Sequence, residues 1–142
     1  MNRMPMLRAL KISLFIRKQD SFPGKSSIFR RFPKDETFSL TSQIRRPSRS
    51  IGAQIAEAWG KRRYEKHFIS KLTDADSEQQ ETQHWLLVSL DCGYAQVAQV
   101  DSLRDRCLEI GRMLNGMVTK ADLFCGAQSQ IIRERSPEYF VD

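Results

Sequence analysis

Apolar residues recur every three or four positions through the middle of this chain of 142 residues, and this period restricts the fold more than any other feature. It places the apolar side chains on one face of a helix. The stripes are Leu40, Ile44, Ile51, Ile55 and Ala58; Tyr64, Phe68, Leu72, Ala75, Gln79, Thr82, Leu86 and Leu90; and Leu103, Cys107, Ile110, Leu114, Met117 and Ala121. They predict a helix that begins near residues 32–38 and ends at Gly60, a second over about 64–90, and a third over about 100–121.

The ends of these helices carry ordinary signals. Asp35 and Glu36 place negative charge near the positive end of the first helix dipole. Gly93 is a good C-terminal stop for the second helix. Asp101 or Ser102 is the expected N-cap of the third.

Two features disturb the stripes. Pro47 removes a backbone hydrogen bond and clashes with the preceding turn, so we expect a kink or break near Arg45 or Arg46. Gln79 and Thr82 are polar positions in the second stripe. They need hydrogen-bond partners if the core closes over them. This level of the core then either contains water or holds specific pairs of hydrogen-bonding side chains.

Both ends of the chain lack a sustained period. A helix is expected over about 5–19 and a short fragment near Ile28, with a turn signalled between them by Pro23 and Gly24. The tail after Phe124 is expected to fray or to dock only loosely. The predicted organisation is a single domain in which residues 1–31 form an irregular or short first helix, residues 32–121 the core of a helical bundle, and residues 122–142 a C-terminal tail.

The composition argues against several classes of protein. No run of about 18 apolar residues is present, so no membrane span is predicted. Lys11 interrupts the N-terminal apolar patch and no cleavage site follows it, which argues against a signal peptide. The cysteines, Cys92, Cys107 and Cys125, are odd in number and lack C-x-x-C spacing. This pattern is typical of reduced thiols, and the sequence predicts a cytoplasmic protein.

The net charge of +6 hides an asymmetry between the two halves of the chain. Residues 1–72 hold 17 Lys and Arg against 5 Asp and Glu, whereas residues 73–142 hold 6 against 12. The balances are therefore +12 and −6. Such a split is typical of a basic face for a polyanion, or of complementary surfaces that meet within one molecule or between subunits. The sequence leaves both interpretations open.

The groups that would carry catalysis are incomplete. Glu81 and His84 form one Glu-x-x-His step, which di-iron bundles use in pairs, but the other histidine, His67, has no matching acid. The acids of this helix spread over more than one face. They are Asp74, Asp76, Glu78 and Glu81. No Gly-rich phosphate loop is present. We therefore predict no catalytic residues, no metal, no cofactor and no small-molecule substrate.

Two groups of basic residues are the remaining signal. The first is Arg45, Arg46 and Arg49, and the second is Lys61, Arg62, Arg63 and Lys66. A rise of about 1.5 Å per residue separates the groups by roughly 20 Å along a helix. The arginine fork suits phosphate oxygens, and Trp59 and Tyr64 are candidates to stack on an exposed base. In the alternative interpretation, the arginines pair with carboxylates of the acidic segment 73–91.

Several motifs occur in a recognisable order. The chain carries Phe-Pro-x-x-Glu at residues 32–36, Leu-Thr-x-Gln-x-Arg-Arg at residues 40–46 and Ser-Ile-x-x-x-Ile-Ala-Glu at residues 50–57. An Arg- and Tyr-rich stretch at residues 62–68 and the segment at residues 109–117 follow. Together these motifs resemble those of the four-helix bundle proteins known as 23S rRNA-intervening sequence proteins, over residues 32 to about 121.

The resemblance implies an all-α, up-and-down antiparallel four-helix bundle of bacterial origin that assembles into a ring, a homopentamer, without known enzymatic activity. It also implies a relation to accessory proteins of diversity-generating retroelements, which bind a reverse transcriptase and nucleic acid. Two departures stand out. Pro23 and Gly24 interrupt the region where the family's first helix continues, so the first helix is expected to be short or broken. Pro47 stands where the family carries a small residue.

These observations favour a non-enzymatic, oligomeric four-helix bundle that binds structured RNA, with ribosomal RNA as the first candidate. The predicted nucleic-acid-binding residues are Arg45, Arg46, Arg49, Lys61, Arg62, Arg63 and Lys66. The alternative is a protein–protein interaction scaffold in which the same charges join subunits. An enzyme ranks third, and no membrane partner is expected.

Overall fold

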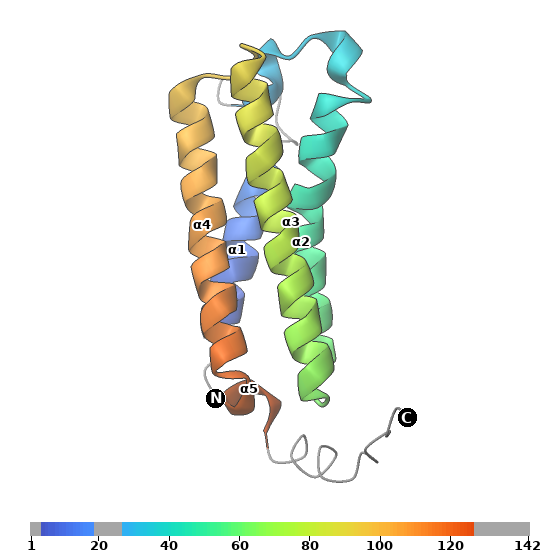
Figure 1. Cartoon of the computed structure of the whole chain (residues 1–142), viewed down its shortest axis with the longest axis vertical. Coiled ribbons are helices and arrows are strands. Elements are labelled where there is room, and N and C mark those ends of the chain that lie inside the picture. Colours follow the sequence, from blue (N-terminus) through green and yellow to red (C-terminus); the bar gives the residue numbers. More distant parts are fainter. Residues whose placement is uncertain (1–3, 19–26, 127–142) are drawn as a thin grey trace, which may run out of the picture.

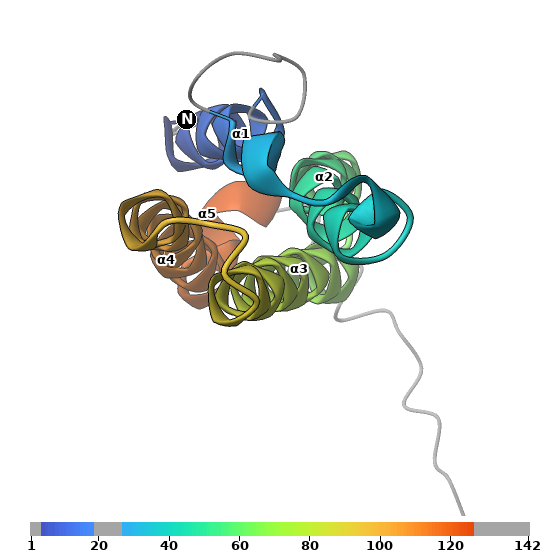
Figure 2. The same cartoon turned by 90° about the horizontal axis from the view of Figure 1, so that it is seen from above.

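Four long helices pack side by side in the computed structural model, which describes residues 4–18 and 27–126. They are α1 (Met4–Lys18), α2 (Leu40–Gly60), α3 (Glu65–Asp91) and α4 (Val97–Thr119). Successive helices run in opposite directions (Figure 1), and seen from above they surround a common centre in the order α1, α2, α3, α4 (Figure 2). The described residues contain no strand. The predicted all-α, up-and-down antiparallel four-helix bundle is confirmed.

The remaining described elements are short. Two 3-10 turns, η1 (Ile28–Arg31) and η2 (Lys34–Glu36), lie between α1 and α2, and α5 (Ala121–Cys125) follows α4. The predicted first helix is confirmed as α1, and the fragment near Ile28 as η1; the predicted turn at Pro23 and Gly24 lies outside the described residues. With 15 residues, α1 is shorter than α2, α3 and α4, which have 21, 27 and 23. None of the described helices combines the length and apolarity that crossing a membrane requires.

The predicted stripes form the core of the bundle, except that Tyr64, predicted in the second stripe, precedes α3 and is 44% exposed. One cluster fills the half of the bundle near α5 and joins α1 to the other helices through Met6, Ala9 and Ile12. Its fully buried members include Phe68, with no exposed surface. A second cluster fills the opposite half, and its buried members are Ile28, Leu40, Ile44, Leu86, Ala95, Val100 and Leu103. Burial of these apolar surfaces is the main term that favours folding.

A polar layer occupies α3 between the two clusters. Gln79 is 5% exposed and Thr82 is fully buried. The Gln79 amide donates to Asp76 Oδ1 at 2.9 Å and accepts from Gln83 Nε2 at 2.7 Å. Thr82 Oγ1 donates to the backbone carbonyl four residues earlier at 2.8 Å. The predicted need for partners is confirmed, and α3 meets it internally. At Gly111 of α4, a Cβ would lie 3.0 Å from Gln79 Nε2, so glycine permits this close approach.

Of the kink or break predicted before Pro47, the break is wrong, and the kink stays a prediction. Helix α2 continues from Leu40 to Gly60 with Pro47 inside it. A proline within a helix costs about 3 kcal/mol because it removes a hydrogen bond and crowds the preceding turn. The Pro47 ring is among the fully buried side chains, and its burial offsets part of that cost. Next to it, Ser48 Oγ donates to the Arg45 carbonyl at 2.9 Å, a local bond that does not replace the one lost at the Gln43 carbonyl.

The N-cap predicted for α4 is also wrong. The helix begins at Val97, so Asp101 and Ser102 lie inside its first two turns and do not cap it. The cap residue is Gln96, whose backbone N–H donates to Gln99 Oε1 at 3.3 Å. Gln96 and Gln99 therefore form the N-terminal cap of α4 that Asp101 or Ser102 was expected to provide.

The C-terminal stops of α2 and α3 agree with prediction. Helix α2 ends at Gly60, and α3 ends at Asp91. Gly93 follows with a φ of 73°, a left-handed conformation that glycine adopts without strain.

The core extends into residues that were expected to belong to a loose tail. Phe124 and Cys125, in α5, are each 8% exposed and belong to the cluster around Phe68. The rings of Phe68 and Phe124 stack with their centroids 6.0 Å apart. Helix α5 thus closes the end of the bundle where α2 turns into α3 (Figure 1). The predicted tail beyond residue 126 lies outside the described residues.

The cysteines differ in their access to solvent. Cys107 and Cys125 are buried, and burial raises the pKa of Cys107 to about 12 and that of Cys125 to about 11. Cys92 is exposed. Because the thiolate is the reactive form, we expect one fast-reacting thiol in the native protein and three after unfolding, measured with Ellman's reagent. Cys92→Ser should remove the fast phase. A second fast thiol in the native protein would contradict the packing of α4 and α5.

Candidate nucleic-acid interface

The first predicted basic group lies along α2. Because this helix buries a single stripe, residues on the opposite side of it face solvent. Arg46 and Arg49 are exposed there. Arg45 is half-buried at the edge of the stripe, and its guanidinium carbon lies 4.8 Å from the centre of the Phe29 ring. The structure thus presents two of the three arginines to solvent and places the third against η1.

The second predicted basic group lies where α2 turns into α3. Lys61 is the C-cap residue of α2, and its backbone N–H donates to the carbonyls of the last turn. Lys61, Arg63 and Lys66 are exposed, whereas Arg62 is half-buried. The chain therefore turns sharply here and leaves three cationic side chains free to face a ligand at this end of the bundle.

Arg62 has a structural role in this turn. Its Nη1 donates to the Trp59 carbonyl at 2.9 Å, and its guanidinium carbon lies 4.3 Å from the centre of the Trp59 ring. Arg62 therefore covers the ring face that was predicted to stack on a base. Tyr64, the second predicted stacking residue, is 44% exposed and lies beside His67, with ring centroids 5.6 Å apart.

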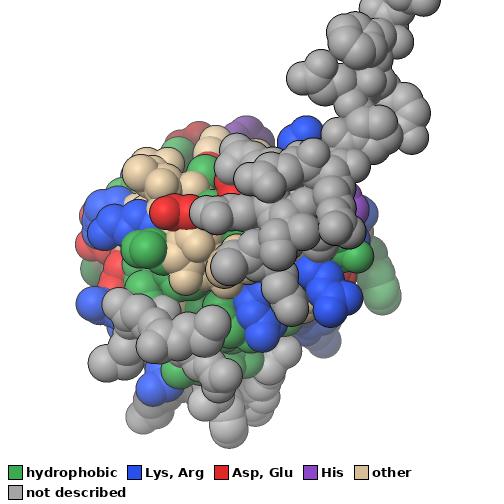
Figure 3. Space-filling view, turned by 90° about the horizontal axis from the view of Figure 1, so that it is seen from below, with side chains coloured by type: hydrophobic (Ala, Val, Ile, Leu, Met, Phe, Trp, Pro, Cys, Tyr) green, Lys and Arg blue, Asp and Glu red, His purple; other side chains and the backbone are tan. Residues whose placement is uncertain are grey.

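The two basic groups do not form one patch. The first group lies within α2 and the second follows its C-terminal end, so the rise of the helix separates them by roughly 20 Å. The second group belongs to the end of the bundle where α2 meets α3 (Figure 1). Seen from below, Lys and Arg side chains are spread around this end, with acidic side chains among them (Figure 3). A ligand that contacts both groups has to follow the length of α2.

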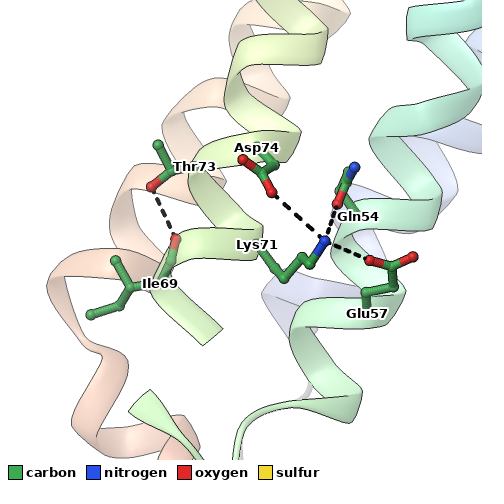
Figure 4. Close-up of polar contacts among 6 residues, drawn as sticks. All are labelled: Gln54, Glu57, Ile69, Lys71, Thr73 and Asp74. Carbon is green, nitrogen blue, oxygen red and sulfur yellow. Dashed lines mark hydrogen bonds and ion pairs between the residues drawn. The ribbon is translucent and has the colours of Figure 1, made fainter. Parts of the chain in front are cut away.

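Lys71 of α3, outside the two basic groups, forms an ion pair with Glu57 of α2. Lys71 Nζ lies 2.9 Å from Glu57 Oε2 and 3.8 Å from Asp74 Oδ2, and it donates to Gln54 Oε1 at 3.3 Å (Figure 4). The hydrogen bond with Lys71 lowers the pKa of Glu57, and the same bond raises the pKa of Lys71. Lys71 therefore neutralises the acid that lies between the two basic groups.

The acidic helix α3 forms no ion pair with four of the exposed predicted cations. Among the residues that the structure describes, Arg46, Lys61, Arg63 and Lys66 form no ion pair. Arg46 lies near Glu78 of α3: burial and the charge of Glu81 raise the pKa of Glu78, and Arg46 opposes this rise. These four cations thus retain most of their positive field for an external anion.

Four further residues of interest were missed by the sequence interpretation. Arg30, Arg31 and Lys34 are exposed on η1 and η2, and Phe38, in the turn before α2, is 96% exposed. The run Arg-Arg-Phe-Pro-Lys at residues 30–34 was the available signal, because it concentrates positive charge beside aromatic residues. These residues lie at the α2 N-terminal end of the bundle, close to the first basic group.

Glu36 fixes this missed segment. Its Oε2 accepts from Ser39 Oγ and from the Leu40 backbone N–H at 3.1 Å, and its Oε1 accepts from Tyr94 OH at 3.3 Å. The hydrogen bond from Ser39 is the largest cause that lowers the pKa of Glu36. Glu36 therefore caps α2, as its position in the sequence suggested, and ties η2 to the turn between α3 and α4.

Both side chains of the Glu-x-x-His step contact Trp85 of the same helix. Glu81 Oε1 accepts from Trp85 Nε1 at 3.2 Å, and the His84 ring lies 4.7 Å from the Trp85 ring. In the described ranges, no group of three or more His, Cys, Asp and Glu side chains is placed to hold a metal ion. A groove of about 410 Å³ between α3 and α4 is lined by Asp76, Gln79 and Arg112, among others, without His or Cys.

The fold and these surfaces define a class: an antiparallel four-helix bundle with exposed cations along one helix and around its following turn. The model of one family within this class, the 23S rRNA-intervening sequence proteins, matches residues 20–116. The chain belongs to this family, and the resemblance read from its motifs is confirmed at that level.

A solved structure supports the same assignment. The chain is similar to a protein of unknown function from the S23 ribosomal protein family of Bacteroides thetaiotaomicron, with 25% identity and a TM-score of 0.69. The alignment covers 82% of this chain and 99% of that protein. No curated protein matches the chain.

Proposed function

We propose that this protein is a non-enzymatic, oligomeric four-helix bundle that binds structured RNA through the basic residues of α2 and the α2–α3 turn. The observation that carries the proposal is the exposure of Arg46, Arg49, Lys61, Arg63 and Lys66 on a half-chain with a charge balance of +12. The family name refers to 23S rRNA, which makes ribosomal RNA the first ligand to test.

The spacing of the cations suits a folded RNA. Phosphates dominate the affinity of most nucleic-acid complexes, and arginine binds them through its planar fork. Two groups roughly 20 Å apart match a ligand that runs along the bundle. Arg45 and Arg62 contribute less directly, because each guanidinium lies over an aromatic ring of its own molecule.

Salt dependence tests this function. We expect gel shifts with a folded fragment of ribosomal RNA to weaken by about 10²- to 10⁴-fold between 50 and 200 mM salt, since each phosphate contact contributes about 0.7–0.9 to the slope of log K against log salt. Arg8→Gln removes one positive charge that already pairs with Glu109 at 2.8 Å, and it should leave binding nearly unchanged. Absence of salt-sensitive binding by the wild type would show that the proposal is wrong.

A protein-interaction scaffold is the second candidate. It is favoured by the opposite charge of the two halves of the chain, +12 and −6, which lets a basic edge of one bundle face the acidic side of the next. Arg46→Glu separates the two functions. If the charges serve assembly, the oligomer dissociates in sedimentation velocity runs. If they serve RNA, the oligomer persists and only the affinity for RNA falls.

A further inference from the structure

Phe38 is the most exposed large apolar side chain among the described residues, at 96%. It belongs to the turn between η2 and α2, at the upper end of the bundle (Figure 1). Other aromatic residues of this region pack on one another: the Phe29 and Phe32 centroids are 5.1 Å apart, and those of Phe32 and Tyr94 are 5.6 Å apart. Phe38 alone among these four rings is turned almost wholly to solvent.

The turn that carries Phe38 is well fixed. The backbone N–H groups of Thr37 and Ser39 donate to the carbonyls of Lys34 and Glu36, each at 3.1 Å. The Glu36 carboxylate adds hydrogen bonds from Ser39, Leu40 and Tyr94. A ligand that covers the ring therefore has to order the Phe38 side chain but not the backbone that carries it.

The chain segments on either side of Phe38 carry exposed cations. Arg30, Arg31 and Lys34 are exposed on the two preceding 3-10 turns, and Arg46 is exposed on α2. The Glu36 carboxylate is engaged in the α2 cap, which leaves Asp35 as the exposed acid of the η1–η2 segment. An exposed aromatic ring among several cations is the arrangement by which proteins hold unpaired nucleotides: the ring stacks on a base and the cations contact phosphates.

We propose that Phe38 is a stacking platform for an unpaired RNA base, and that Arg30, Arg31, Lys34 and Arg46 hold the phosphates on either side of it. This inference rests on the proposed RNA-binding function and specifies the class of RNA. The protein should prefer RNA with a loop or bulge to a continuous duplex, because a base within a duplex cannot present its face to the ring.

The test uses a hairpin RNA with 2-aminopurine in its loop and a blunt duplex with the sequence of its stem. We expect the protein to bind the hairpin more tightly and to change the 2-aminopurine fluorescence on binding. Phe38→Ala should weaken hairpin binding by about 5- to 150-fold, the range for one stacked base, remove the fluorescence change and leave duplex binding unaltered. Phe38→Tyr, which keeps a ring, should behave like the wild type.

The controls separate this inference from the proposed function. Leu123→Ala removes another exposed apolar side chain, 67% exposed, and should change neither affinity nor fluorescence. If Phe38→Ala binds the hairpin as the wild type does, with salt-sensitive affinity intact, the stacking site is wrong and the RNA-binding function stands. If the wild type binds neither RNA, both proposals are wrong. Dissociation of an oligomer by Phe38→Ala with unchanged RNA affinity would assign the ring to a subunit contact and overturn the stacking site.

Discussion

Phe68→Ala is expected to lower the free energy of unfolding by about 3–5 kcal/mol, the usual cost of removing a buried aromatic ring. Phe68 has no exposed surface and lies in the cluster that joins α1, α2, α3, α4 and α5. Its ring stacks on Phe124 at 6.0 Å, so the substitution removes an aromatic contact and leaves a cavity. Urea denaturation followed by circular dichroism measures the change.

The matched control for this core substitution is Phe38→Ala. It deletes the same side chain at a position that is 96% exposed, so its effect should stay within about 0.5 kcal/mol. Phe124→Ala should destabilise the protein substantially as well, because it removes the partner ring from α5. Equal unfolding midpoints for Phe68→Ala and Phe38→Ala would contradict the packing of α3 described above.

The sequence determined the burial pattern because the helical period is a geometric rule. Phe68, Leu72, Ala75 and Leu86 were predicted to share one face of a helix, and all are buried. The polar position Gln79 was predicted to need partners, and it finds them one turn away in each direction along α3. Contacts of this kind are local, so the spacing of residues is enough to predict them.

The errors arose where tertiary contacts outweigh local preference. Pro47 has a local cost that favours a break, but its ring is buried, a contribution that no local rule includes. The residues after Phe124 show no helical repeat of apolar positions, yet Phe124 itself packs on Phe68 at the end of the bundle. These outcomes depend on how helices meet in space, which periodicity along one helix does not specify.

The candidate site was predictable in part for the same reason. Arg46 and Arg49 are exposed because they lie opposite the buried stripe of α2, as its period requires. The contact of Arg62 with Trp59 and the outward direction of Phe38 depend on turn geometry instead. Turns lack a repeating pattern, so the sequence interpretation credited Trp59 with an open face and overlooked Phe38.

Neutralising the exposed predicted cations should have the largest effect on RNA binding. A variant with glutamine at five positions is expected to reduce the slope of log K against log salt by about 3.5–4.5, or 0.7–0.9 for each lost phosphate contact. The positions are Arg46, Arg49, Lys61, Arg63 and Lys66. Because these side chains are exposed, the unfolding free energy should change by no more than about 0.5 kcal/mol for each substitution. Fluorescence anisotropy across a salt series measures the slope.

Position on the bundle can be separated from total charge by a second variant with glutamine at Arg8, Lys11 and Arg112. These exposed residues belong to α1 and α4, away from the predicted surface. If the protein is attracted to any polyanion through its net charge, each charge removed should reduce the slope of log K against log salt equally in both variants. A defined surface on α2 predicts a loss in the first variant and almost none in the second. Equal losses per charge would contradict a defined RNA site.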